Sequence, residues 1–219
     1  AVAHLDTVQD DRRCNVVDTA SGLLAVSGAL DDRLGAYVIL ELLPRLGMTF
    51  DVLLTTDEER GRSTADEFET DKDYDWVIEF DRGGTDVVMY DYETPDLVDL
   101  VEACGARVGV GIFSDICELE HLGCAAFNWG VGYQDYHGPR SRAWLDDTFR
   151  MVARFEKFHR ANAGTRLAHT PPPRREWWET YKDEDAAYDA AIREFDEEHL
   201  MMADCGDMVD LDDPASYVT

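Results

Sequence analysis

Apolar and polar residues follow two repeating patterns from residue 1 to about residue 160. Short apolar runs predict strands at 1–8, 23–28, 50–55, 75–81, 86–90 and 124–130. Between them, apolar residues recur at helical spacing, at Leu34, Val38 and Leu42, within 95–104 and from about 141 to 159. Alternating strands and helices are typical of α/β proteins. We therefore predict a three-layer α/β fold in which helices flank a mostly parallel central sheet.

The run from Phe50 to Gly61 combines a predicted buried strand with charged residues at its end. An apolar stretch rich in Val and Leu stops at three consecutive carboxylates, Asp57, Glu58 and Glu59. Open α/β sheets bind ligands just beyond the carboxyl ends of their strands. Two adjacent glutamates at such a position can bind a metal and transfer a proton, respectively. Acidic pairs also occur in ordinary solvated helices, and 197–198 is an example of such a pair.

The length of 219 residues fits one compact domain with a tail. We predict a catalytic domain over 1–163, a proline-rich linker over 164–175 and an acidic helical tail over 176–219. The tail is expected either to pack its tryptophans on the domain or to offer a surface to a partner. No apolar run reaches the roughly 18 residues of a membrane span, and no secretory leader is recognisable before the first strand.

The charge balance narrows the classes of partner. The net charge is -27, and arginine greatly outnumbers lysine among the 20 basic residues. Such a field repels nucleic acid and anionic membranes. It favours adaptation to molar salt, although an unusually acidic protein of an ordinary cytoplasm is the alternative. The five cysteines are odd in number and lack Cys-x-x-Cys spacing, so we expect reduced thiols and a cytoplasmic location, in a high-salt cytoplasm.

Carboxylates and histidines recur at the ends of the predicted elements. These residues are His4, Asp6, Asp31, Asp32, Glu58, Glu59, Asp81 and His137. A parallel sheet collects strand ends along one edge, and nitrogen and oxygen donors without thiolate suit Zn²⁺, Mn²⁺ or Co²⁺. These donors are more than one catalytic zinc binds, and they suit two ions that share a carboxylate. Helix capping is the alternative for the Asp31–Asp32 pair.

Three motifs carry a resemblance to a known family. His4–Val8, Asp31–Gly35 and Thr55–Gly61, in this order, resemble the co-catalytic di-zinc exopeptidase superfamily. This superfamily includes zinc aminopeptidases, glutamate carboxypeptidase and amino-acid deacylases, and the resemblance covers about residues 1–160. The stretch from Glu59 to His137 is too short for the lid or dimerisation domain of larger members, so the likeness is to small, single-domain ones.

The resemblance implies a set of metal ligands. Asp31 matches the carboxylate that bridges two metals. His4 and Asp81 would complete one metal site, and Glu59 and His137 the other. The expected cofactor is two Zn²⁺, with Mn²⁺ or Co²⁺ as alternatives.

The resemblance also implies catalytic roles. Glu58 matches the general base that takes a proton from the metal-bridging water, and Asp6 matches the carboxylate that orients His4. The Asp31–Asp32 peptide bond would be cis. Candidate substrate contacts, adjacent to the site by position, are Arg82, Asp115, Tyr133 and Arg140.

These expectations define a preferred function and its alternatives. We expect a di-metal hydrolase that cleaves a peptide or small amide bond, most simply an aminopeptidase-like exopeptidase. A deacylase of small N-acyl amino acids is the nearest alternative. A non-catalytic binding or structural module with the metallopeptidase fold comes next, followed by an acidic α/β protein whose carboxylates serve salt tolerance alone. Substrate, native metal and oligomeric state stay open.

Overall fold

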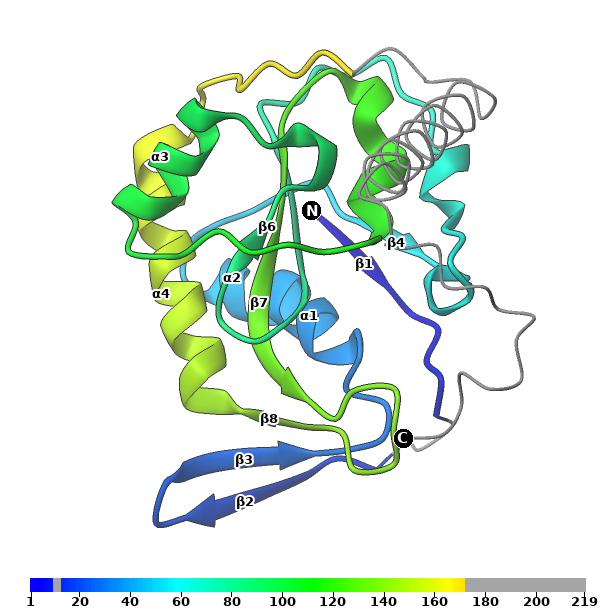
Figure 1. Cartoon of the computed structure of the whole chain (residues 1–219), viewed down its shortest axis with the longest axis vertical. Coiled ribbons are helices and arrows are strands. Elements are labelled where there is room, and N and C mark those ends of the chain that lie inside the picture. The colour runs from blue at the N-terminus through cyan, green and yellow to red at the C-terminus, as the bar shows by residue number, and fades with distance from the viewer. Residues whose placement is uncertain (10–12, 172–219) are drawn as a thin grey trace, which may run out of the picture. The chain divides into compact units, whose positions relative to one another are not determined.

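A computed structural model of the chain describes residues 1–9 and 13–171 (Figure 1). The described residues belong to one compact unit. Residues 164–171, which the sequence assigns to a linker, are part of this unit, and the Ala125 N–H donates to the Leu167 carbonyl at 2.7 Å. The rest of the predicted linker and the acidic tail over 176–219 lie outside the described residues.

The centre of the unit is an eight-stranded sheet with the order β2-β3-β8-β7-β5-β1-β4, and β6 pairs with β7 off this path. In chain order the strands are β1 (Val2–His4), β2 (Asn15–Thr19), β3 (Gly22–Val26), β4 (Leu53–Thr55), β5 (Val77–Gly83), β6 (Val87–Val88), β7 (Ala126–Gln134) and β8 (Arg142–Trp144).

The sheet is mixed rather than mostly parallel. Strands β4, β1, β5 and β7 pair in parallel, whereas β2–β3, β3–β8, β7–β8 and β6–β7 pair antiparallel. The α/β class and the flanking helices are confirmed. The antiparallel pairing of β2 and β3 follows from the short connection between them. Their register continues to the pair Thr19–Gly22, and a hairpin this short joins only antiparallel strands.

Strand β4 is an edge strand, so the expectation of a buried strand over 50–55 is wrong. Val52 is 38% exposed and Leu54 is 43% exposed. The apolar composition reflects β propensity, which does not distinguish a central strand from an edge strand. Strand β4 still places the segment that follows it beside His4, because its last residue, Thr55, pairs with His4 at the end of β1.

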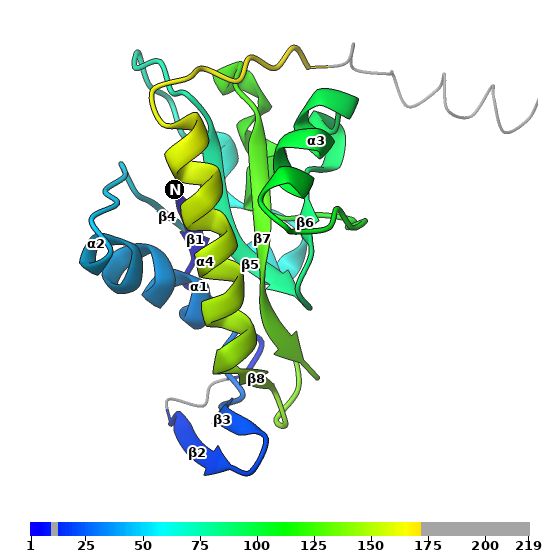
Figure 2. The same ribbon diagram turned by 90° about the vertical axis from the view of Figure 1, so that its left-hand side faces the viewer.

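Helices cover both faces of the sheet (Figure 2). On one face lie α1 (Arg33–Tyr37), which continues through the π-helix η1 (Val38–Leu42) into α2 (Leu43–Arg45), and α4 (Leu145–Asn162). Helix α3 (Pro95–Ala103) lies on the other side and confirms the helix predicted over 95–104. Short 3₁₀ helices are η2 (Glu58–Arg60), η3 (Thr64–Glu67), η4 (Tyr90–Tyr92) and η5 (Asp115–Leu122).

An aromatic core fixes α4 to the sheet. The ring of Phe155 on α4 lies 5.3 Å from those of Phe80 on β5 and Trp129 on β7, measured between centroids. All three side chains are fully buried, and such edge-on pairs add to the stabilisation from area burial. The core therefore holds β5 and β7 rigidly beneath the edge where the charged residues gather. Among the described residues, no helix combines the length and the apolar character needed to cross a bilayer.

Candidate metal centre

The parallel strands end at one edge of the sheet, and five predicted ligands gather there. His4 is the last residue of β1, and Asp81 lies in the second half of β5. The turn after β4 carries Glu58–Glu59 in η2. Asp31 comes from the loop that precedes α1, and His137 comes from the loop that follows β7. Residues far apart in the sequence thus supply one cluster.

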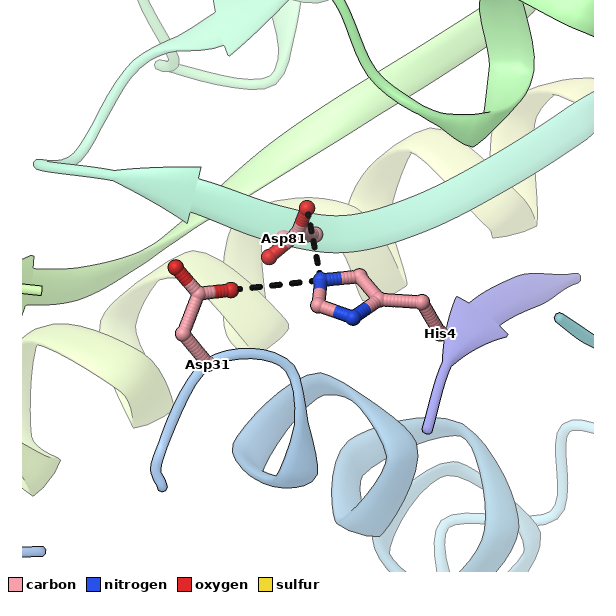
Figure 3. Close-up of side chains that lie close together, drawn as sticks. All are labelled: His4, Asp31 and Asp81. Atoms are coloured by element: carbon pink, nitrogen blue, oxygen red, sulfur yellow. Dashed lines mark ion pairs between the residues drawn. The ribbon is translucent and has the colours of Figure 1, made fainter. Parts of the chain in front are cut away.

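The first half of this cluster is the buried triad His4–Asp31–Asp81 (Figure 3). His4 Nε2 lies 3.3 Å from Asp31 Oδ1 and 3.6 Å from Asp81 Oδ2. The His4 side chain is fully buried, and both carboxylates point toward its ring. One nitrogen and two carboxylate oxygens converge on a single small volume.

The second half is the triad Asp31–Glu59–His137, which opens to solvent. His137 Nε2 lies 3.3 Å from Asp31 Oδ2 and 3.0 Å from Glu59 Oε2. The His137 side chain is 52% exposed. Asp31 presents Oδ1 to the first triad and Oδ2 to the second, so one carboxylate joins the two halves.

The two aspartates before α1 have different roles. The Asp32 side chain caps α1, accepting a hydrogen bond from the Gly35 N–H at 3.1 Å. A side chain at Gly35 would collide with the Asp32 carboxylate and the Phe80 carbonyl, so the turn requires glycine. Capping therefore accounts for Asp32 and leaves Asp31 free to face the histidines. The peptide bond between the two aspartates is cis, as the resemblance implies.

Asp6 holds His4 through its backbone more closely than through its carboxylate. His4 Nδ1 lies 3.0 Å from the Asp6 carbonyl oxygen and 3.5 Å from Asp6 Oδ1. The carboxylate instead accepts the Glu59 N–H on Oδ2 at 3.3 Å. A proton on Nδ1 satisfies the contact with the carbonyl and leaves the Nε2 lone pair for a cation. The expected orienting role of the carboxylate thus shifts to the carbonyl.

Glu58 lies at the edge of the first triad without joining it. Its Oε2 is 3.8 Å from His4 Nε2, and its side chain is 13% exposed. Burial, helped by the negative charges of Asp115 and Asp31, raises the pKa of Glu58 to about 7. A carboxylate that titrates near neutrality can both accept and return a proton.

In the metal-free chain, the residues of the triads shift one another's pKa values. Burial raises the pKa of Asp81 well above its ordinary value, and repulsion from Asp31 adds to the rise. Burial alone would lower the pKa of His4, but the carboxylates of Asp31 and Asp81 raise it above its ordinary value. Among the described residues, the buried atoms His4 Nε2, Glu59 Oε2 and Asp81 Oδ1 make no hydrogen bond apart from the ion-pair contacts within the triads. Convergent donors that contact only one another fit divalent cations.

A cavity of about 440 Å³ adjoins the triads. Besides Asp31, Glu58, Glu59, Asp81 and His137, its lining includes Arg82, Tyr90, Val110, Ile112, Phe113, Tyr133 and Tyr136. Charged donors at one end and apolar or aromatic side chains elsewhere are typical of small-molecule sites.

Two of the four predicted substrate contacts line this cavity. Arg82 does so, but its guanidinium is also engaged by Asp86 Oδ1 at 3.3 Å and donates to the Val110 carbonyl at 2.9 Å. The Tyr133 hydroxyl contacts Asp32 Oδ1 at 3.1 Å, so this residue holds the turn before α1. Both therefore shape the cavity.

The other two lie elsewhere. Arg140 is exposed on the loop between β7 and β8 and is not part of the cavity lining. Asp115 is fully buried and accepts hydrogen bonds from the hydroxyls of Thr55 and Ser63. Its carboxylate is thus committed to the protein rather than exposed to a substrate.

The sequence interpretation missed three buried polar residues next to the triads. These residues are Glu79, Ser114 and Asn128. A signal existed for Glu79, which lies two positions before Asp81 in a predicted strand and thus recurs with the period of a strand face. No pattern pointed to the other two.

Two comparisons of the sequence, with family models and with curated proteins, add nothing to these observations. No family model matches the sequence, and no curated protein matches it significantly. The likeness to di-zinc exopeptidases therefore rests on the motifs of the chain and stays a prediction.

Proposed function

We propose that this chain is a di-metal hydrolase that cleaves a peptide or small amide bond, most simply an aminopeptidase-like exopeptidase. The observation that carries the proposal is the pair of triads joined through Asp31, with one oxygen directed at each half. His4 and Asp81 would hold one ion, and Glu59 and His137 the other. Zn²⁺ suits this donor set, with Mn²⁺ and Co²⁺ as alternatives.

The chain supplies the proton transfer. Bound divalent ions would lower the pKa of a water and polarise the amide carbonyl. Glu58 would accept the proton of that water and pass it to the leaving amine, since its side chain borders both the triads and the cavity. The Asp6 carbonyl holds the ring of His4 in place for this task.

The cavity suits a small substrate. Its volume of about 440 Å³ is in the range of pockets for single residues or short amides. Val110, Ile112 and Phe113 offer apolar contact along the wall. A peptide end or a small amide is therefore the proposed partner, rather than nucleic acid or membrane, which the net charge of -27 disfavours. The same charge supports a high-salt cytoplasm as the proposed location.

A deacylase of small N-acyl amino acids is the second candidate. Among the described residues that line the cavity, Arg82 is the one arginine or lysine, and it could face the carboxylate of such a substrate. Because Arg82 already pairs with Asp86, its guanidinium is less available to a substrate carboxylate, and the exopeptidase is the preferred candidate.

Metal reconstitution tests the proposal. The full chain would be freed of metal, loaded with Zn²⁺ or Co²⁺ in molar salt, and offered aminoacyl amides and N-acyl amino acids. We expect two bound equivalents and hydrolysis in one of the two panels. Glu58→Gln should keep both metals and lose about 10²–10⁴-fold in turnover, the usual contribution of a general base. One equivalent or none, or equal turnover in Glu58→Gln, would reject the mechanism and favour a binding module.

A further inference from the structure

Six buried polar residues form two hydrogen-bonded sets beside the metal centre, and the sets meet where Ser114 and Asp115 are neighbours in the chain. We call this group the buried polar bracket, and its members are Thr55, Ser63, Glu79, Ser114, Asp115 and Asn128. None of them is a proposed ligand, and none lines the cavity. Buried polar networks of this kind fix a unique arrangement when their members are hydrogen-bonded.

Asp115 ties down the turn that carries Glu58–Glu59. Its Oδ2 accepts the Thr55 hydroxyl at 2.7 Å, and its Oδ1 accepts the Ser63 hydroxyl. Thr55 is the last residue of β4, and Ser63 directly precedes η3. One fully buried carboxylate thus holds both ends of the seven-residue segment 56–62.

Ser114 and Asn128 hold the other half of the centre. The Ser114 hydroxyl donates to Glu79 on β5, and Asn128 Nδ2 donates to Ser114 Oγ at 3.0 Å. The Oδ1 atom of Asn128 then accepts the backbone N–H of Asp81 at 3.0 Å. The backbone of a proposed ligand is therefore fixed through a side chain of β7.

From these contacts we infer that the buried polar bracket positions the two halves of the metal centre separately. Asp115 positions the Glu58–Glu59 turn, and Asn128 positions Asp81. Both are positioning residues, since neither faces the cavity. The inference rests on the proposed metal centre. Loss of a partner that orients a ligand typically costs about 10–100-fold in metal affinity, so the effect is measurable without any substrate.

The test is a calorimetric titration of the metal-free full chain with Zn²⁺ or Co²⁺. Both variants keep the shape of the side chain. Asp115→Asn replaces one of the two acceptor oxygens by an NH2 donor, and Thr55→Val removes the Thr55 hydroxyl, which also contacts the Ala3 carbonyl at 3.2 Å. The segment 56–62 keeps its closing hydrogen bond from the Thr64 N–H to the Thr56 carbonyl, at 3.1 Å. Thr148→Val is the matched control, because it removes a buried hydroxyl that donates to the Val131 carbonyl at 2.7 Å, from helix α4.

We expect Asp115→Asn and Thr55→Val to weaken one equivalent about 10–100-fold, the same equivalent that His137→Ala removes. Thr55→Ser should restore the affinity, and Thr148→Val should leave both equivalents unchanged. Unchanged affinities in Thr55→Val, or an equal loss in Thr148→Val, would overturn the positioning role alone. Failure of the unaltered chain to bind metal would instead reject the proposed centre, and the positioning role with it.

Discussion

The two halves of the proposed centre differ in how the fold supports them. His4 and Asp81 lie on neighbouring strands of the sheet, and the His4 side chain is fully buried. Glu59 and His137 lie in a turn and a loop, His137 has a backbone φ of 63°, and its side chain is 52% exposed. Sites on strands are held more precisely than sites on loops. One fold thus supplies a rigid half and an accessible half, and Asp31 joins them.

Replacing the shared residue should have the largest effect. Asp31→Asn removes the charge that both halves use, so we expect each of the two metal equivalents to lose more than the 10–100-fold typical of an outer partner. Titration with Zn²⁺ measures this loss. A variant that loses affinity in only one half would show that Asp31 does not join the two.

Replacing each histidine in turn should separate the halves. In the metal-free chain, His4→Ala leaves buried carboxylates without a cationic partner, which costs about 3 kcal/mol of unfolding free energy. His137→Ala should cost less than about 1 kcal/mol, because the half-exposed imidazole is screened by solvent even though its carboxylate partners are buried. Urea unfolding of the two variants beside the unaltered chain gives both values. Equal losses would contradict the distinction between a buried and an open half.

The metal-free chain should lose stability as the pH rises. Burial raises the pKa of Glu58 to about 7, above its unfolded value, so the folded chain binds more protons between these values. Burial also raises the pKa of Glu59 and Asp81, and the hydrogen bond with Asp31 raises the pKa of His137. These groups therefore also lower the stability as the pH rises. The stability present at pH 4.5 should fall by on the order of 2 kcal/mol by pH 8, discounted for solvent screening.

Urea unfolding with a chelator at both pH values measures this fall in unfolding free energy. Glu58→Gln should show a smaller fall. Metal binding should follow the opposite trend, because ligands bind metal when they are deprotonated. A metal-free chain that gains stability from pH 5 to pH 8 would contradict the crowding of carboxylates described here.

The smallest expected effect concerns the open side of the cavity. Val110 and Ile112 are 87% and 100% exposed, yet they line the cavity beside the accessible half. Ile112→Ser should lower kcat/KM for leucine amides relative to alanine amides by less than about 10-fold, since one apolar contact at a rim is lost. Leu46→Ser, at a residue 47% exposed outside the cavity, is the control. Equal ratios in all three proteins would exclude Ile112 from substrate contact.

The sequence allowed more of the site to be predicted than of the sheet. Carboxylates and histidines at element ends carry local signals, and the five proposed ligands do come together. Strand neighbours are set by tertiary packing, so neither the edge position of β4 nor the antiparallel pairing of β8 could be read from composition. Asp115 was predicted as a substrate contact because the burial of a side chain cannot be read from the sequence. The partners of Ser114 and Asn128 come from distant strands.

Anomalous diffraction at the zinc edge, from crystals of the full chain grown with Zn²⁺ in molar salt, would locate the two ions directly. The account predicts two peaks, each within about 2.0–2.2 Å of a different oxygen of Asp31, with His4 and His137 on opposite ions. A single peak, or two peaks that do not share Asp31, would contradict it.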